Sequence, residues 1–155
     1  MAGSFTMQVK KFREETEDKI RTTVRWICLE ITSRVIMKTP VDTGRARGSW
    51  TPALDVIPGG REAIDKSGTA PLMEADSVLV QFRLGQTFYL INSVPYIMAL
   101  EYGRFPQNPT GGGKTRSGKS KTVGGFSRQA PKGMVRVTLS EFPGIVDNSV
   151  VRSTR

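Results

Sequence analysis

The stretch NSVPYIMALEYG (Asn92 to Gly103) marks the point where we expect the chain to pass from a sheet into a helix. The run before it, Thr87 to Ile91, is rich in β-branched and aromatic residues, which is typical of a strand. Pro95 suits the first position of a helix, where its missing N–H leaves no bond unmade. Gly103 is well placed to end that helix. The stretch therefore predicts a strand, a tight turn and a short helix, which together set the angle between a sheet and a helix.

Residues 5 to 38 show the period of one long helix, with no proline or glycine between Ser4 and Thr39. Its apolar stripe recurs at three- and four-residue steps: Phe5, Val9, Phe12, Thr16, Ile20, Val24, Ile27, Ile31 and Val35. At 1.5 Å per residue such a helix is roughly 50 Å long, more than a small domain can cover. We therefore expect part of the stripe to pack on a neighbouring subunit. The alternative is a stripe used wholly within its own core.

Shorter patterns predict the elements that follow this helix. Trp50 to Ile57 is expected to form a strand, and Arg61 to Thr69 is polar enough for a loop. Ala70 to Leu84 has the spacing of a helix, although the alternation from Val78 to Leu84 is the signal of a strand. We favour the helix, which places a second helical segment before the strand at Thr87.

The C-terminal region predicts a last helix that begins at Ala130-Pro131 and breaks or kinks at Pro143-Gly144. Together the elements indicate an α+β fold, in which a long N-terminal helix and further helices pack on a small antiparallel sheet. We expect one domain over residues 1–155, with residues 104–126 as a flexible basic loop insertion.

Composition excludes several kinds of chemistry. The 155 residues include no histidine and one cysteine, Cys28, so histidine bases, intrachain disulfides and cysteine metal cages are all ruled out. We predict no enzyme activity, no metal and no cofactor. A formal net charge of +9 indicates an acidic partner, which is nucleic acid, an anionic protein surface or a membrane face. No apolar run approaches membrane-spanning length, so we expect no membrane partner and a protein kept in the cytoplasm until it is assembled.

The insertion RFPQNPTGGGKTRSGKSKTVGGF (Arg104 to Phe126) has little apolar content and is expected to form a mobile loop. Four of its residues match the spacing of a phosphate-binding P-loop: Gly113, Gly118, Lys119 and Ser120. That mechanism needs a buried strand before the loop and a helix after it. Neither flank has that pattern, which argues strongly against nucleotide binding.

Basic side chains give the same region a different interpretation. They form a polybasic arm made of Lys114, Arg116, Lys119, Lys121 and Arg128. Such an arm could lie along DNA phosphates or in an acidic protein groove. The alternative is a solvated hairpin tip. No aromatic residues alternate with the charges, so stacking on single-stranded bases has no support.

Three further arginines lie where they could contact partners. Arg45 and Arg47 stand between a capping turn and the aromatic Trp50, and guanidinium groups bind both phosphate and carboxylate well. Solvated charges are the alternative, and we favour the partner contact. Arg136 lies opposite the apolar face of the last helix, from which it could reach Glu101 or a neighbouring chain.

Three blocks carry a family resemblance: TPVDTGRARGSW (Thr39 to Trp50), NSVPYIMALEYG (Asn92 to Gly103) and SRQAPKGMVRVTLSEF (Ser127 to Phe142). They resemble, in the expected order, the signature blocks of the tail-completion and neck proteins of tailed phages. This family includes the minor tail protein Z of lambda-like phages and the HK97-type tail components. The blocks cover about 40 of the 155 residues, and the helix before them also fits.

The resemblance implies a non-enzymatic virion subunit that forms a ring, expected to be hexameric, at the head-proximal end of the tail. Such a ring completes the tail and joins it to the head, beside the head-closure connector, the tail terminator and the tail tube. Contact with genomic DNA in the lumen is a further expectation, and a basic DNA-binding protein acting through residues 114–128 is the alternative function. The insertion at 104–126 departs from the family pattern, in which the second block runs on to the third after a few residues.

Family positions are carried over to this chain as fold corners and as contacts with subunits or partners. The expected corners are Asp42, Thr43, Gly44, Asn92, Pro95, Tyr96, Gly103, Gln129, Pro131 and Met134. The expected contact residues are Arg45, Arg47, Glu101, Tyr102 and Arg136. None is expected to be catalytic.

Overall fold

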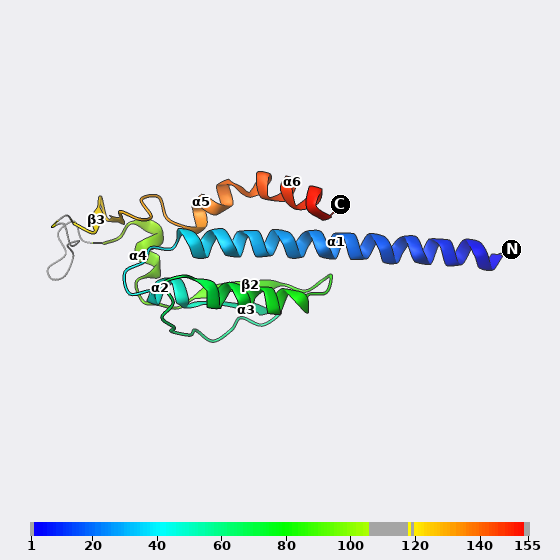
Figure 1. The fold of residues 1–155 in the computed structure, drawn as a ribbon, viewed down its shortest axis with the longest axis horizontal. Helices are drawn as coiled ribbons and strands as arrows, with labels where there is room; N and C mark the ends of the chain where they lie inside the picture. Colours follow the sequence, from blue (N-terminus) through cyan, green and yellow to red (C-terminus); the bar gives the residue numbers. More distant parts are fainter. Residues whose placement is uncertain (1, 106–117, 119, 154–155) are drawn as a thin grey trace.

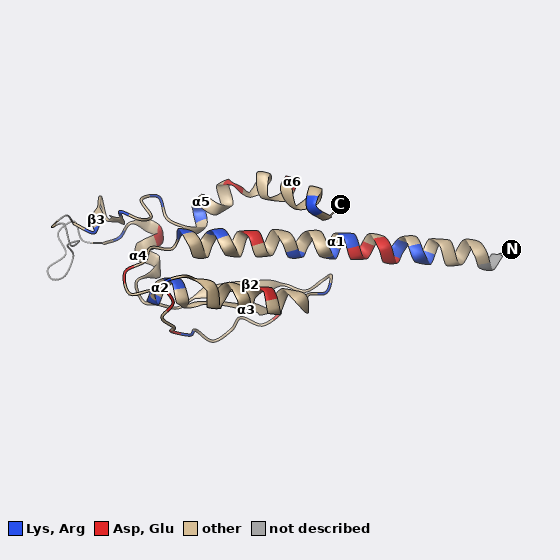
Figure 2. Cartoon of the chain, viewed as in Figure 1, with Lys and Arg blue, Asp and Glu red and all other residues tan. Residues whose placement is uncertain are grey.

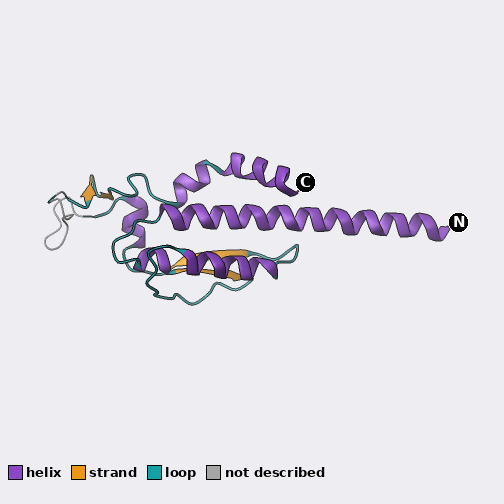
Figure 3. Ribbon diagram, in the orientation of Figure 1, coloured by secondary structure: helices purple, strands orange, loops and turns teal. Residues whose placement is uncertain are grey.

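A computed structural model describes residues 2–105, 118 and 120–153 of the chain. The fold is α+β, as predicted, and helices dominate it (Figure 1, Figure 3). The elements in order are α1 (Ala2–Lys38), α2 (Arg45–Gly48), β1 (Trp50–Leu54), α3 (Thr69–Val80), β2 (Phe88–Asn92), α4 (Ile97–Tyr102), β3 (Thr122–Val123), β4 (Phe126–Ser127), α5 (Val135–Ser140) and α6 (Phe142–Ser153).

Helix α1 is the axis around which the other elements are arranged. Helices α5 and α6 run along one side of it, while α3 and the sheet of β1 and β2 lie on the other side (Figure 1). Strands β1 and β2 pair antiparallel, from Trp50 opposite Asn92 to Leu54 opposite Phe88. Strands β3 and β4 form a second, shorter antiparallel pair near α4. None of the described helices is both long and apolar enough to cross a membrane.

The N-terminal half of α1 projects beyond the rest of the molecule (Figure 1). The helix has 37 residues, and only its second half is covered by α3, α5 and α6. In the projecting half, Phe5 and Phe12 are each 70% exposed, and Val9 and Ile20 are also exposed. The prediction that one chain cannot cover the whole apolar stripe is therefore confirmed. That a neighbouring subunit covers it stays a prediction.

Trp50 anchors α1 to the sheet. Its side chain is buried beside Val35 and Ile36 of α1, and its indole N–H donates a hydrogen bond to the buried hydroxyl of Thr39 at 2.9 Å. Because the ring fills the space where the end of α1 meets β1, its removal leaves both a cavity and an unused acceptor.

Trp50→Phe is expected to lower the free energy of unfolding by about 2 kcal/mol. Denaturant unfolding followed by circular dichroism measures this. Trp26→Phe is the matched control, because Trp26 is 39% exposed and its ring contacts the Arg152 guanidinium at 5.7 Å. That control should cost below about 1 kcal/mol. Equal losses for the two variants would contradict the anchoring role of Trp50.

Two predicted elements are shorter in the structure than the sequence indicated. The first strand ends at Leu54 instead of Ile57, because Asp55 adopts a left-handed backbone with φ 61° and turns the chain. Helix α3 ends at Val80 instead of Leu84. The helical interpretation of this segment, as opposed to the strand, is confirmed.

Both proline-based helix starts were wrong. Helix α4 begins at Ile97, so Pro95 precedes the helix and lies in the turn. The last helical region begins at Val135 instead of Ala130-Pro131, because Gly133 has a positive φ of 85°, which does not belong to a helix. The predicted break is present, but it separates α5 from α6 at Glu141, and Pro143 falls in the first turn of α6.

Candidate functional site

The three sequence blocks meet in one buried cluster, which we name the three-segment junction. Ala46 comes from the first block, Val94 and Leu100 from the second, and Ala130 and Met134 from the third. All five side chains are buried. Segments far apart in the sequence therefore share one small core, and the blocks form a single structural unit.

Glu101 is the central polar group of this junction. Its side chain projects from α4 to the start of α5, where its carboxylate accepts hydrogen bonds from the backbone N–H groups of Met134 (2.7 Å), Val135 (2.9 Å) and Arg136 (2.9 Å). The Arg136 guanidinium adds a bond to the same carboxylate at 3.2 Å and another to the Glu101 carbonyl at 2.6 Å. Glu101 thus caps a helix that begins more than 30 residues later, and it uses the unpaired N–H groups of the first turn.

The pKa of Glu101 reflects two opposing effects. Burial favours the neutral acid and raises the pKa, whereas the three backbone N–H bonds and the Arg136 bond favour the carboxylate. The hydrogen bonds prevail, and the pKa is lower than that of an ordinary glutamate. The group therefore remains charged in the folded protein, as a helix-capping anion must.

Two side-chain amides tie the same segments together. Asn92 donates to the carbonyl of Ala46 at 2.7 Å, and its oxygen accepts from the Val94 N–H at 3.2 Å. The Gln129 amide makes two hydrogen bonds with the backbone of Val41. Its oxygen accepts from the Val41 N–H and its nitrogen donates to the Val41 carbonyl, each at 2.7 Å. Both residues were predicted as fold corners, and both join two of the three blocks.

Two glycines allow another backbone segment to approach closely: Gly44, which was predicted as a corner, and Gly133, which directly precedes the predicted corner Met134. Gly44 has φ 95°, and a Cβ there would lie 2.8 Å from the backbone of Asp65. At Gly133, with φ 85°, a Cβ would lie 2.6 Å from the Glu101 carbonyl. A larger residue at Gly133 would push apart two segments that meet at the junction, and one at Gly44 would displace the loop at Asp65.

The other predicted corners lie around the junction. Asp42 pairs with Lys121 at 2.8 Å, and the Thr43 hydroxyl accepts from the Arg45 N–H at 3.3 Å. Tyr96 packs against the buried cluster. Gly103 has φ 67° and faces the ring of Phe126, while Pro95 and Pro131 are exposed.

The predicted partner contacts Arg45 and Arg47 bind groups within their own chain. Arg45 pairs with Glu62. Arg47 donates to the carbonyls of Met37 (2.9 Å) and Thr39 (2.9 Å), so it satisfies the free carbonyl groups at the end of α1. Arg47 is therefore a helix-capping residue, and sequence spacing did not reveal that role because it depends on where α1 ends.

Tyr102 lies between two arginines on the surface. Its ring is contacted by the guanidinium of Arg136 at 5.0 Å and by that of Arg104 at 5.6 Å, and the residue is 44% exposed. Arg104 was not among the predicted site residues. Its position directly after the second block, two residues from an exposed tyrosine, was the available signal.

The insertion is more structured at its ends than the sequence suggested. Phe105 packs against the junction and its N–H donates to the Gly125 carbonyl at 3.0 Å. Of the predicted basic arm, Lys121 pairs with Asp42, and the Arg128 guanidinium donates to the Ser120 carbonyl. Lys114, Arg116 and Lys119 lie outside the described residues, as does Gly113 of the P-loop match. The segment directly after that match, β3, is a strand and not the required helix.

A groove of about 850 Å³ opens beside the junction. Its apolar lining includes Val41, Ala46, Ile64, Tyr96, Leu100 and Phe105. Arg45, Lys121 and Arg128 contribute basic groups to the same groove. Asp42 also lines the groove and pairs with Lys121, so the lining combines apolar side chains with groups of both charges.

Within the described part of the chain, no three His, Cys, Asp or Glu side chains lie close enough together to hold a metal ion. Cys28 is half-buried, and burial raises the pKa of its thiol, which disfavours a reactive thiolate.

Comparisons with protein-family models, curated proteins and solved structures each found no match.

Proposed function

We propose that the chain is a structural subunit of the neck of a tailed-phage particle. In this proposal, copies form a ring at the head-proximal end of the tail, complete the tail and join it to the head. The observation that carries the proposal is the projecting half of α1, whose apolar stripe is left uncovered by its own chain (Figure 1). An apolar helix face of this length is characteristic of a contact with another protein.

The three-segment junction adds support from the sequence blocks. The block residues pack into one hydrogen-bonded body around Glu101, and the long helix extends beyond that body. A ring subunit needs such a body and an extended contact element, because a closed ring joins one face of each copy to a different face of the next. We propose six copies, with the head-closure connector, the tail terminator and the tail tube as neighbours in the virion.

A stop codon early in the gene tests the virion role in the phage that encodes the chain. Plaque formation on a non-suppressing host is expected to fall to background, and a plasmid copy of the wild-type gene should restore it. Growth of the mutant without the plasmid would contradict a required neck subunit.

DNA binding is the second candidate, favoured by the stacking of Arg104 and Arg136 on the exposed Tyr102. In this role the surface would hold phosphates of DNA in the lumen together with the basic arm. The purified protein should then bind duplex DNA with an affinity that falls steeply with salt, by a log–log slope of about −0.9 per phosphate contact. Alanine at Arg104, Lys114, Arg116 and Lys119 should reduce that slope. A DNA affinity that changes neither with salt concentration nor with these alanine substitutions would exclude this role.

A further inference from the structure

A polar hollow of about 650 Å³ lies between α1 and the turn that joins α3 to β2. Its basic lining consists of Arg21 and Arg25 from α1 and Arg83 from that turn. Arg21 and Arg25 are four residues apart, so they share one side of the helix. Figure 2 shows basic positions on both α1 and the turn at this end of the body. The hollow therefore gathers guanidinium groups from two distant parts of the sequence.

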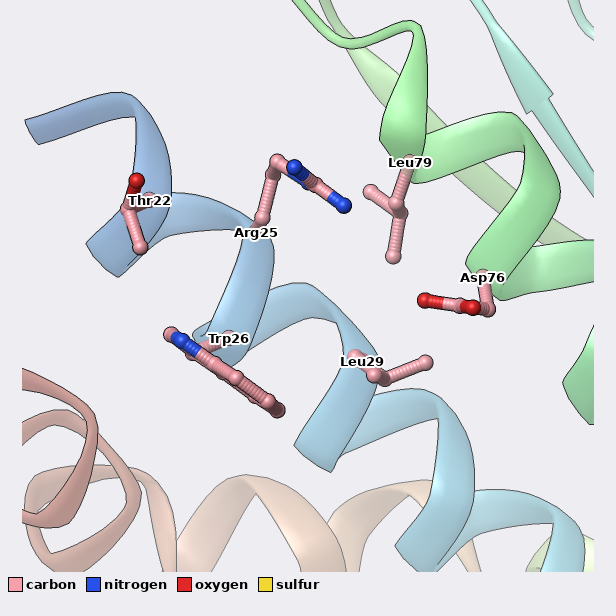
Figure 4. Close-up of a pocket in the computed structure, with 6 residues that line it drawn as sticks. All are labelled: Thr22, Arg25, Trp26, Leu29, Asp76 and Leu79. Carbon is pink, nitrogen blue, oxygen red and sulfur yellow. The ribbon is translucent and has the colours of Figure 1, made fainter. Parts of the chain in front are cut away.

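Two of these three guanidinium groups have no partner within the described chain. Arg25 reaches from α1 towards α3, beside Leu79 (Figure 4). Its side chain makes no hydrogen bond or ion pair with any residue that the structure describes, and its Nε atom is buried. The side chain of Arg83 is equally unpaired, because only its backbone N–H is bonded, to Gln86 at 2.7 Å. Arg47, by contrast, binds two carbonyls of its own chain.

The unpaired state of Arg25 is unfavourable for an isolated chain. The residue is half-buried, so part of its guanidinium has lost contact with water. A charged group that is partly desolvated is stabilised by an anion or by hydrogen-bond acceptors, and here the described residues supply neither. The hollow therefore presents donors that a bound anion can use.

Asp55 is the one carboxylate among the side chains that line the hollow. Its two oxygens are already engaged, since one accepts from the Gln86 amide at 2.6 Å and the other from the Thr87 N–H at 2.9 Å. It forms no ion pair with an arginine of the described chain. Three arginines against this single carboxylate give the lining a positive charge.

Two further carboxylates lie near the hollow without lining it. Asp18 pairs with Arg21 at 2.7 Å, so Arg21 is already neutralised within its own helix. Asp76 lines the smaller neighbouring pocket, where it forms no ion pair with Arg25 (Figure 4). The groups left for a ligand are thus the guanidinium groups of Arg25 and Arg83.

The placement of these two groups favours phosphate over a carboxylate. Guanidinium forks bind both anions, but a carboxylate holds its two oxygens in one plane. A phosphate group offers acceptor oxygens on several sides, so donors on two walls of a hollow can bind it together. Arg25 stands on α1 and Arg83 on the turn after α3, and the amide of Gln81 adds an unpaired donor to the lining.

We propose that this hollow is a phosphate-binding site, with Arg25 and Arg83 as its principal ligands and Gln81 as a further donor. The phosphate belongs either to a DNA backbone or to a free phosphate ion. The site lies at the end of the body from which α1 projects, whereas Tyr102 ends α4 at the opposite end (Figure 1). It is therefore separate from the surface of Tyr102 and the basic arm.

Arg25→Gln with Arg83→Gln is the hollow variant that tests the site in the full-length purified chain. Glutamine removes both charges, and since neither side chain is bonded within the described chain, the fold should be kept. Far-ultraviolet circular dichroism checks this. Lys10→Gln with Lys66→Gln is the control for net charge, because both side chains are exposed and lie outside the hollow.

Thermal unfolding in inorganic phosphate and in chloride, at equal ionic strength, measures binding of the free ion. The wild type and the control variant should gain about 2 °C more in Tm from phosphate than the hollow variant does. Phosphate also stabilises proteins by its exclusion from their surface, but that effect acts on all three chains alike. The difference between the chains therefore reports the site.

Fluorescence anisotropy with a labelled DNA duplex, measured over a range of salt concentrations, distinguishes the two sources of phosphate. If the hollow binds the DNA backbone, the hollow variant should lose about 1.8 from the log–log salt slope, which corresponds to two phosphate contacts. If its ligand is free phosphate, the gain in Tm is lost and the DNA slope is unchanged.

A hollow variant that keeps both the phosphate gain and the DNA slope of the wild type would overturn the site. So would a hollow variant whose one defect is weaker binding of polyglutamate, because the ligand would then be a carboxylate. The assays need no particle, so the site and the neck assignment can fail independently. The substitutions at Arg104 and the basic arm test a different surface, so DNA binding there can also fail on its own.

Discussion

Glu101→Ala is expected to lower the free energy of unfolding by about 3 to 5 kcal/mol, the largest loss for any single change proposed. Glu101 is only 6% exposed, and its carboxylate accepts from three backbone N–H groups and from Arg136. Alanine leaves these donors without their acceptor, and it leaves the Arg136 guanidinium without its anion. The end of α4 and the start of α5 should therefore lose their contact with each other.

Denaturant unfolding at neutral pH measures this loss, and Glu62→Ala is the matched control. Glu62 pairs with Arg45, but its side chain is 50% exposed, so its removal should cost below about 1 kcal/mol. A loss at Glu101 no greater than the loss at Glu62 would contradict the capping role.

The pH dependence of the free energy of unfolding provides a second test of the role of Glu101. The folded-state pKa of Glu101 is lower than its value in the unfolded chain, so the unfolded state binds a proton first as the pH falls. The stability from this group is thus fully present above the ordinary glutamate pKa of about 4.3 and is lost as the pH falls through the lower folded pKa. The difference between wild type and Glu101→Ala should shrink over that acidic range. A difference that stays constant with pH would contradict the assignment.

Phe5→Ser combined with Phe12→Ser should abolish plaque formation by the stop-codon phage when supplied from a plasmid, while leaving the unfolding midpoint unchanged. Both rings are 70% exposed on the projecting half of α1, so they add little to the stability of their own chain. In a ring they would be buried against a neighbour, where aromatic side chains contribute strongly to binding.

Val56→Ser with Met73→Ser is the matched control for that experiment. These two apolar side chains are 70% and 66% exposed, but they lie outside α1. They should support plaque formation as the wild type does. Full complementation by the Phe5 and Phe12 variant would contradict a required contact at the projecting half of α1, on which the neck assignment rests.

Local pattern was enough to predict much of the fold. The 3.6-residue period of the apolar stripe predicted α1 almost to its ends, and the spacing after Ala70 predicted α3 as a helix. Both signals depend on residues close together in the sequence, which is why they could be interpreted without a structure. The start of α5 was misplaced because Gly133 and the carboxylate of Glu101 determine it, and that carboxylate lies 33 residues before Met134.

The residues of the candidate site were predictable, but of their contacts only the pairing of Arg136 with Glu101 was expected from the sequence. Asn92, Glu101 and Gln129 were all named from the blocks, whereas their partners depend on how three distant segments meet. Arg47 is a further residue that was named from the sequence but whose contacts were not predicted. Its charge suggested a partner, but the end of α1 provides the acceptors that bind it.

The proposed role of the chain is to join the phage head to its tail. Electron microscopy of particles from the stop-codon phage, grown on a non-suppressing host, tests it most directly. The neck assignment predicts filled heads beside separate tails, and the length and end structure of those tails would distinguish tail completion from tail joining. Normal joined particles would contradict the assignment and favour DNA binding at Arg104 and the basic arm.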